Sequence, residues 1–314
     1  MKSKEADMEK YSGRGIRLRR DIVRNKYIYL MILPVFAWYV IFHYIPMLGS
    51  VIAFQDYKPA KGFLGSTWVG LKHFIDFFKG PYAWRLIRNT LLLNIYQIIF
   101  GFPAPIILAL LINEVQSGAY KKAIQTISYM PHFISIVVVC GLLSEFSRTD
   151  GLFNVILASL GFETRNLLSD ASLFRTIFTA SGIWQSVGWG SIIYLATLST
   201  VDPTLYEAAK IDGAGRWRQV WNISLPALFP VIIIQFIMRM GNIMTQGYEK
   251  VILLYNPLTY ETADVLSSYV YRRGLIQMDF SFGAAVGIFN SVVNILVLVA
   301  VNGTFRRKTG DSLW

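Results

Sequence analysis

Hydrophobic residues in this chain gather in six runs, each long enough to cross a bilayer as a helix. An α-helix needs about 20 apolar residues to span roughly 30 Å of hydrocarbon. The runs cover residues 27–54, 88–112, 123–146, 173–198, 225–246 and 280–301. The first is longer than one span, so we expect it to bend or to leave the membrane early. The pattern predicts an all-α integral membrane protein with six transmembrane helices.

Lysine and arginine are distributed unevenly between the segments that connect these runs. Cytoplasmic loops of membrane proteins carry an excess of both residues. With a cytoplasmic N-terminus, the inner segments hold 17 Lys and Arg and the outer segments hold 10, so we predict an N-in, C-in orientation. The corresponding division is a basic N-terminal segment at 1–26, a membrane domain at 27–301, outer loops at 55–87, 147–172 and 247–279, and a cytoplasmic tail at 302–314.

The composition supports a membrane protein and argues against several soluble classes. Hydrophobic residues make up 54% of the chain and charged residues 16%, whereas soluble domains carry about 25% charged residues. A net charge of +11 would suggest nucleic acid in a soluble protein, but here it fits orientation and attraction to anionic membrane lipid. Cys140 is the single cysteine, so no intrachain disulfide can form, and we expect a buried apolar side chain.

Two stretches of the outer loops have the spacing of short helices. In 71–78, apolar residues recur at 71, 74, 75 and 78, which is typical of a helix lying on the membrane interface. Residues 263–277 also favour a helix, with Arg272 and Arg273 near its end. Such helices could pack against the membrane domain or dock a protein from outside, and the pattern leaves both options open.

The chain lacks the residue constellations that enzymes need. It has no Gly-x-x-x-x-Gly-Lys-Ser/Thr loop to cradle nucleotide phosphates and no Gly-x-Ser-x-Gly nucleophile elbow. His43, His73 and His132 are scattered, without metal-ligand spacing. We therefore predict no catalytic residue, no metal site and no cofactor in this chain.

The segment between the fourth and fifth runs, 202–226, carries clear local signals. Asp202 suits a helix N-cap and Pro203 the first helical position, which predicts a short helix over 203–212. Gly213 can adopt positive φ and end that helix. A second short helix is expected over 216–223, with Pro226 at the start of the fifth span. Two short helices meeting at a glycine would form a compact knob on the cytoplasmic face.

This segment resembles the EAA motif of importer-type ABC permeases. Glu207-Ala208-Ala209 is followed after three residues by Gly213, and after nine more by Ile-x-Leu-Pro at 223–226, so every defined position matches. The resemblance extends from about residue 26 to the C-terminus and is strongest to MalF-like sugar permeases, in particular the LplB-like subfamily. Further segments similar to that subfamily are 29–39, 54–58 and 267–275.

The resemblance implies a type I ABC importer permease fold and a set of partners. Such a permease pairs with a second, similar permease, and each presents its loop to one of two cytoplasmic ATPase subunits, which bind ATP and Mg²⁺. An extracellular solute-binding lipoprotein delivers a carbohydrate to the pair in the plasma membrane of a bacterium. The residues implied to contact the ATPase are Glu207, Ala208, Ala209, Asp212, Gly213 and Ala214.

Polar residues inside the predicted spans are candidates for the solute pathway, because polar groups in a membrane usually face the bundle interior. Three helical stripes hold them: His132 and Ser135 in the third run; Trp184, Gln185 and Gly188 in the fourth; and Arg239, Asn242 and Gln246 in the fifth. The alternative is that these groups form hydrogen bonds between helices as packing contacts. Trp189, Asn94, Gln97, Asn290 and Asn294 are interpreted as packing residues.

Arg239 is placed by the pattern near the middle of the fifth run, where a permanent charge costs about 2.5–3.5 kcal/mol. A hydrated pathway or a buried anion would offset that cost. Because arginine binds carboxylates through two parallel hydrogen bonds, an acidic oligosaccharide derived from a polysaccharide is favoured over a neutral one. The neutral alternative stays open, since arginine also binds sugar hydroxyl groups.

A second class of function is a self-sufficient secondary transporter or channel for a polar solute. Secondary carriers usually hold intramembrane carboxylates and paired broken helices in two halves. Glu145, at the end of the third run, is the one carboxylate within the six runs, and no such symmetry is visible. The sequence therefore favours the importer permease.

Overall fold

The computed structural model describes residues 23–245, 247–310 and 312–314, and this part of the chain is mostly helical. Its two strands, β1 (Gln55–Asp56) and β2 (Thr67–Trp68), form one short antiparallel pair. The predicted all-α class is confirmed for the described residues. Most of the basic segment 1–26, up to residue 22, and the predicted pathway residue Gln246 lie outside them.

Four helical segments of the described chain are both long enough and apolar enough to cross a membrane. They correspond to the first, second, fifth and sixth predicted runs. The elements that form them are α3 (Lys26–Tyr39), η1 (Val40–Tyr44), α4 (Ile45–Leu48) and η2 (Gly49–Phe54); α7 (Ala83–Tyr96), η3 (Gln97–Gly101) and α8 (Pro103–Asn113); α14 (Arg216–Gln219), η6 (Val220–Ser224) and α15 (Leu225–Met240); and α19 (Phe280–Lys308).

The third predicted run is broken. α9 (Gly118–Tyr129) continues into η4 (Met130–Phe133), and this segment meets α10 (Ile136–Phe146) at 94°, so the run at 123–146 is not one continuous helix. Pro131 cannot donate a helical hydrogen bond. Ser135 then begins the new helix, where its hydroxyl accepts a bond from a backbone N–H three residues on.

The fourth predicted run is a single helix, α12 (Phe174–Leu198). Its 25 residues are enough to cross a bilayer. Its serine, threonine and glycine residues make α12 less apolar than the four segments above. For that reason α12 does not count among the segments that are apolar enough to cross a membrane. By length and apolarity alone, four segments of the described chain could cross a membrane, or five if the broken pair α9–α10 is one span.

Turns of π-helix precede three prolines of the long helices. They are η1 before Pro46, η3 before Pro103 and η6 before Pro226. Proline lacks an N–H and crowds the preceding turn, and the wider π turn lets the helix continue past it. As a result α14, η6 and α15 form one helix over Arg216–Met240, which corrects our expectation of a separate helix over 216–223.

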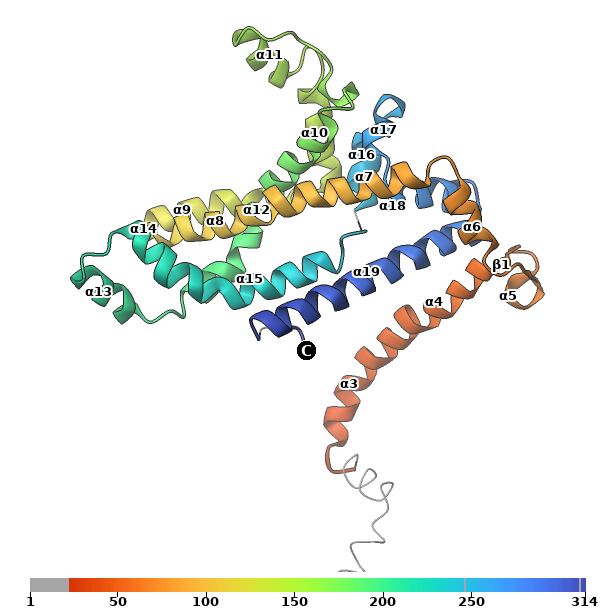
Figure 1. Ribbon diagram of the computed structural model, residues 1–314, viewed down its shortest axis with the longest axis horizontal. Coiled ribbons are helices and arrows are strands. Elements are labelled where there is room, and N and C mark those ends of the chain that lie inside the picture. The colour runs from red at the N-terminus through yellow and green to blue at the C-terminus, as the bar shows by residue number, and fades with distance from the viewer. Residues whose placement is uncertain (1–22, 246, 311) are drawn as a thin grey trace, which may run out of the picture.

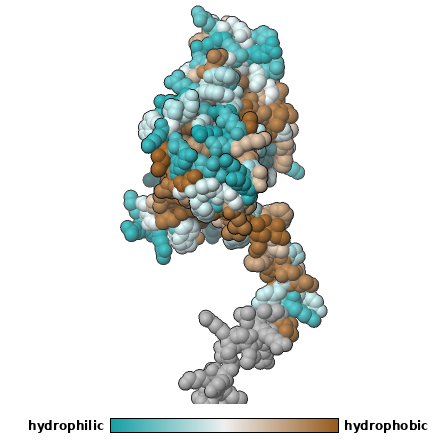
Figure 2. All heavy atoms as spheres, turned by 90° about the vertical axis from the view of Figure 1, so that its right-hand side faces the viewer, coloured by the Kyte–Doolittle hydropathy of each residue, from teal (hydrophilic) through white to brown (hydrophobic). Residues whose placement is uncertain are grey.

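The helices pack around α12, which lies along α8 and α9, while α19 lies along α6, η2 and α15. The first segment, Lys26–Phe54, is the exception, because none of its most apolar window is buried in the chain. It leaves the body at an angle (Figure 1), and Figure 2 shows apolar side chains along its surface. A helix this apolar on every side must be covered by lipid or by another protein.

The loops predicted to lie outside the membrane contain short helices of their own. The predicted helix at 71–78 is confirmed as α6 (Lys72–Lys79). The predicted helix at 263–277 begins later, because Asp264 is extended, with ψ of 122°. The remaining elements are α5 (Gly62–Gly65), α11 (Leu152–Ser159), η5 (Leu167–Ser169), α16 (Tyr248–Leu254), η7 (Pro257–Thr259), α17 (Tyr260–Ala263), α18 (Leu266–Val270) and η8 (Tyr271–Ile276).

A buried ionic cluster ties these outer elements together. Asp264, only 1% exposed, accepts two hydrogen bonds from the Arg272 guanidinium, at 2.9 and 2.6 Å, and one from the Ser268 hydroxyl at 2.7 Å. A nitrogen of Arg85 on α7 lies 3.9 Å from the same carboxylate. Asn89 of α7 donates to the backbone carbonyl of Asp264 over 3.0 Å. The cluster therefore holds the loop at 247–279 against α7.

Changing Asp264 to asparagine is expected to lower the free energy of unfolding by about 3 kcal/mol. Breaking one side of a buried ion pair costs about 3–5 kcal/mol, and we place the loss at the low end because Arg272 is 24% exposed and can be partly hydrated. Asp56→Asn is the matched control, since Asp56 is 54% exposed and 3.9 Å from Lys58. Thermal unfolding in detergent should show a lowered midpoint for Asp264→Asn alone; equal midpoints would contradict this account.

Candidate functional site

The loop at 202–226 forms the expected knob. α13 (Pro203–Ile211) begins at Asp202, whose side chain accepts a hydrogen bond of 2.9 Å from the backbone N–H of Thr204. That hydrogen bond lowers the pKa of Asp202, so the cap is ionised at neutral pH. Gly213 ends the helix with φ of +74°, the left-handed conformation that glycine adopts without strain.

The knob is fastened to the long helix that follows it. The Tyr206 hydroxyl and the Ser224 hydroxyl lie 3.0 Å apart, and the Gln219 side-chain amide donates to the carbonyl of Ala214 over 2.8 Å. The first contact joins α13 to η6, and the second joins α14 to the turn that follows α13. Because α14, η6 and α15 are one helix, the knob is attached directly to the N-terminal end of Arg216–Met240.

The outer surface of the knob is exposed and mixes charge with apolar side chains. Leu205 is 52% exposed, Ile211 87% and Trp217 76%. Glu207 and Asp212 are also exposed. The knob lies at one end of the long axis of the molecule, and α5, α6 and β1 lie at the other (Figure 1). Clustered exposed apolar residues mark a surface that binds another protein.

Two adjoining cavities are lined by residues of η3, α12 and α15, with α8 at the larger and η4 and α16 at the smaller. The larger has a volume of about 700 Å³ and the smaller about 370 Å³. Gln97, Ser186 and Arg239 line both, so the two form one polar compartment. Volumes of about 300–1,000 Å³ are typical of small-molecule sites.

Four predicted pathway residues line this compartment. His132 and Gln185 face the smaller cavity, Asn242 faces the larger, and Arg239 faces both. Gln185 is held by a hydrogen bond of 3.0 Å from its amide to the carbonyl of Ile134. Arg239 lies in the last turn of α15 rather than mid-span, because the helix ends at Met240. A cation is favoured at a helix C-terminus, so Arg239 costs less here than at a helix centre.

Three other predicted pathway residues lie outside the cavity linings. Trp184 is 49% exposed on another face of α12. Ser135 caps α10. Gly188 is buried against α9, where an added Cβ would overlap the backbone carbonyl of Ser128. Close backbone packing accounts for this glycine.

The sequence interpretation missed several residues of the compartment. Gln97 and Trp189 were assigned to packing, but both line it, and the Trp189 ring stacks on His132 with centroids 4.5 Å apart. Gln235 could have been found, since it lies one turn before Arg239 on the same helical face. Lys250 comes from the loop at 247–279, between two predicted spans, where no helical periodicity within a span could place it.

Positive charge dominates the compartment. Arg239 and Lys250 are the charged residues of its lining, and in the described part of the chain neither lies within 4 Å of a carboxylate. The described residues contain no group of three His, Cys, Asp or Glu that could hold a metal ion. The arrangement therefore suits a polar, anionic solute held by hydrogen bonds.

Residues 85–309 match the family described as "Binding-protein-dependent transport system inner membrane component". The chain belongs to this family. It is thus a component of a bacterial plasma-membrane transport system, and its role in the system is that of a permease. The resemblance drawn from Glu207-Ala208-Ala209 and Gly213 is confirmed.

Relatives cover nearly the whole permease. Protein LplB of Bacillus subtilis (strain 168) is 44% identical over 96% of this chain and 96% of its own length. The polygalacturonan/rhamnogalacturonan transport system permease protein YteP of the same organism is 46% identical over 94% and 92%. A chain in the crystal structure of a bacterial alginate ABC transporter, in complex with an alginate pentasaccharide-bound periplasmic protein, is 43% identical, with a TM-score of 0.88 over 95% of this chain and 100% of that chain.

Proposed function

We propose that this chain is one permease subunit of an ABC importer for an acidic oligosaccharide. The observation that carries the proposal is the connection between the exposed knob and Arg239 through one helix, Arg216–Met240. That helix is about 37 Å long at 1.5 Å per residue. An ATPase that binds the knob at one end could therefore change the shape of the polar compartment near the other.

The solute is inferred from the chemistry of the compartment. Gln97, Gln185 and His132 offer hydrogen bonds to sugar hydroxyl groups, and the Trp189 ring offers an apolar face to sugar C–H groups. Arg239 can bind a carboxylate through two parallel bonds. Two relatives support a uronate-containing solute, since one is named for polygalacturonan and rhamnogalacturonan and the other was solved with alginate.

The first helical segment supports a second permease in the complex. The most apolar window of Lys26–Phe54 is unburied in this chain, and the segment is directed away from the body (Figure 1), so a neighbouring subunit could cover it. We infer six spans with both termini in the cytoplasm. Four of them are the strongly apolar segments, and the other two are α12 and the broken pair α9–α10. One permease would then supply half of the pathway wall.

The ATPase is assigned to the knob formed by Glu207, Ala208, Ala209, Asp212, Gly213 and Ala214. Its apolar side chains and its exposed carboxylates suit a groove with a basic rim. ATP and Mg²⁺ would bind the ATPase subunits, and an extracellular lipoprotein would deliver the solute. A secondary carrier is disfavoured, because the described lining of the compartment holds no carboxylate for a coupling ion.

Co-purification tests the proposal. A tagged form of this chain, expressed with the permease and ATPase of the same system, should bring down both partners in detergent. The same tag on a chain whose knob residues 203–215 are replaced by a Gly/Ser linker should retain the permease and lose the ATPase. Recovery of the intact tagged chain without any ATPase would overturn the assignment.

A further inference from the structure

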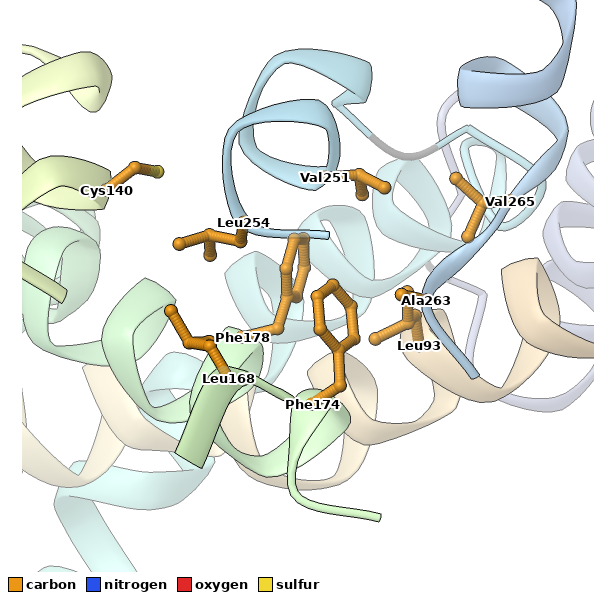
Figure 3. Packing of buried hydrophobic residues seen from close by; sticks show 9 residues of the cluster. All are labelled: Leu93, Cys140, Leu168, Phe174, Phe178, Val251, Leu254, Ala263 and Val265. Carbon is orange, nitrogen blue, oxygen red and sulfur yellow. The ribbon is translucent and has the colours of Figure 1, made fainter. Parts of the chain in front are cut away.

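Lys250 reaches the polar compartment from an outer loop rather than from a predicted span. It lies on α16, whose neighbouring residues Val251 and Leu254 are 0% and 3% exposed. Figure 3 shows these two side chains packed beside Phe174 and Phe178 of α12. The packing fixes α16 against the membrane domain, so the position of Lys250 is set by a rigid core.

The Lys250 ammonium is held at the wall of the smaller cavity. Its Nζ donates a hydrogen bond of 2.8 Å to the carbonyl of Phe178 and lies 4.7 Å from the centre of that ring. A Cβ added at Gly182 would be 3.3 Å from Nζ, so the glycine leaves room for the ammonium. An ammonium has three N–H donors, and Phe178 accepts from one of them.

The remaining donors have no acidic partner in the described chain. The other polar side chains of the cavity lining are Gln97, His132, Gln185, Ser186 and Arg239, none of which is an anion. A partly buried cation is unfavourable unless an anion or water compensates it. A neutral donor would be sufficient for the bond to the Phe178 carbonyl, so that bond does not account for the charge of Lys250.

We propose that Lys250 is a specificity-determining residue, which together with Arg239 binds the carboxylate of a uronic acid unit as it enters the permease from outside. This role of Lys250 rests on the proposed import of an acidic oligosaccharide. It names the residue that selects the acidic sugar at the outer end of the pathway. Arg239 lies deeper, at the boundary of the two cavities, and Lys250 lies on the outer loop. A carboxylate leaving the binding protein would meet Lys250 first.

The charge of Lys250 responds to pH near neutrality. Burial lowers the pKa of Lys250 from 10.5 to about 8, and the nearby Cys140 acts weakly in the opposite direction. Because the pKa is lowered, the ammonium is charged below pH 8 and neutral above it. Affinity for an anionic sugar should therefore fall as the pH rises from 7 to 9.

Other ionisable groups lie on the elements that pack against α16 or in the cavity that Lys250 lines. They are Cys140 and Glu145 on α10, Arg175 and Tyr194 on α12, Tyr269 on α18, and His132 and Arg239 in the shared cavity. Glu145 lies 3.4 Å from Arg148 at the surface, and Arg175 donates to Asn89. A variant that changes only residue 250 keeps all of these groups.

The test uses the complete importer in liposomes, with its binding protein and internal ATP. The probes are a radiolabelled trisaccharide of uronic acids and the same trisaccharide after reduction of its carboxyl groups. Lys250→Gln can still donate to the Phe178 carbonyl and serves as the neutral variant. Lys250→Arg retains the charge at every pH in the test.

At pH 7, Lys250→Gln should lower uptake of the acidic trisaccharide about tenfold, because one charge-assisted hydrogen bond contributes about that much to binding. Uptake of the carboxyl-reduced trisaccharide should stay within about twofold of the wild-type value. Lys250→Arg should restore acidic uptake and remove its decline between pH 7 and pH 9. Equal losses for both sugars in Lys250→Gln, or an unchanged pH profile in Lys250→Arg, would overturn this role. If the wild-type importer takes up neither sugar, the proposed function fails and this inference fails with it.

Discussion

Reversing the charge of Glu207 to lysine is expected to uncouple ATP hydrolysis from transport. Glu207 is exposed on α13 at the tip of the knob, where we propose that it faces a basic residue of the ATPase. Like charges placed opposite each other at an interface cost several kcal/mol. Uptake should therefore fall roughly a hundredfold, while the ATPase subunits still hydrolyse ATP.

The matched control is Glu163→Lys, because Glu163 is also exposed but lies in the outer loop 147–172. This variant should transport at the wild-type rate. Both variants should reach the membrane in equal amounts, since neither side chain is buried. Wild-type uptake by Glu207→Lys would remove Glu207 from the ATPase interface.

Replacing Arg239 with glutamine is expected to weaken uptake of an acidic oligosaccharide by roughly tenfold to a hundredfold. A hydrogen bond to a charged group contributes about 1.5–3 kcal/mol, which corresponds to that range. Glutamine keeps a polar side chain at the boundary of the two cavities but loses the charge. Uptake of a neutral, carboxyl-reduced analogue should change much less.

Two controls separate solute binding from assembly. The Arg239→Gln complex should elute with all its subunits in size-exclusion chromatography. Arg239→Lys should recover part of the acidic uptake, because lysine keeps the charge but cannot form two parallel bonds. Equal losses for acidic and neutral sugars would show that Arg239 supports the helix and does not bind the solute.

The knob at 202–226 could be predicted in detail because its signals are local. The Asp202 cap, Pro203 and Gly213 each act through their own backbone or through residues a few positions away. The sequence did not reveal the π turn η6, which allows Arg216–Met240 to continue as one helix through Pro226. Whether a helix ends at a proline depends on packing that the local sequence does not contain.

The residues of the polar compartment were predictable only in part, because a polar stripe does not show which side of a helix faces the inside of the bundle. On α12 the prediction took Trp184, Gln185 and Gly188. Gln185 lines the cavities together with Ser186 and Trp189, whereas Trp184 and Gly188 lie outside the two linings. The break after Pro131 brings His132 to the compartment. Lys250 depends on the packing of an outer loop over α12, which only the tertiary structure can show.

The most direct measurement is sugar uptake by liposomes that contain this chain, its partner permease and the ATPase, with the binding protein outside. Uptake of an acidic oligosaccharide should require all four proteins and ATP inside the liposome. Liposomes with this chain alone should neither hydrolyse ATP nor accumulate sugar, because one permease supplies half of the pathway and no nucleotide site. Sugar accumulation by the chain alone would contradict the account.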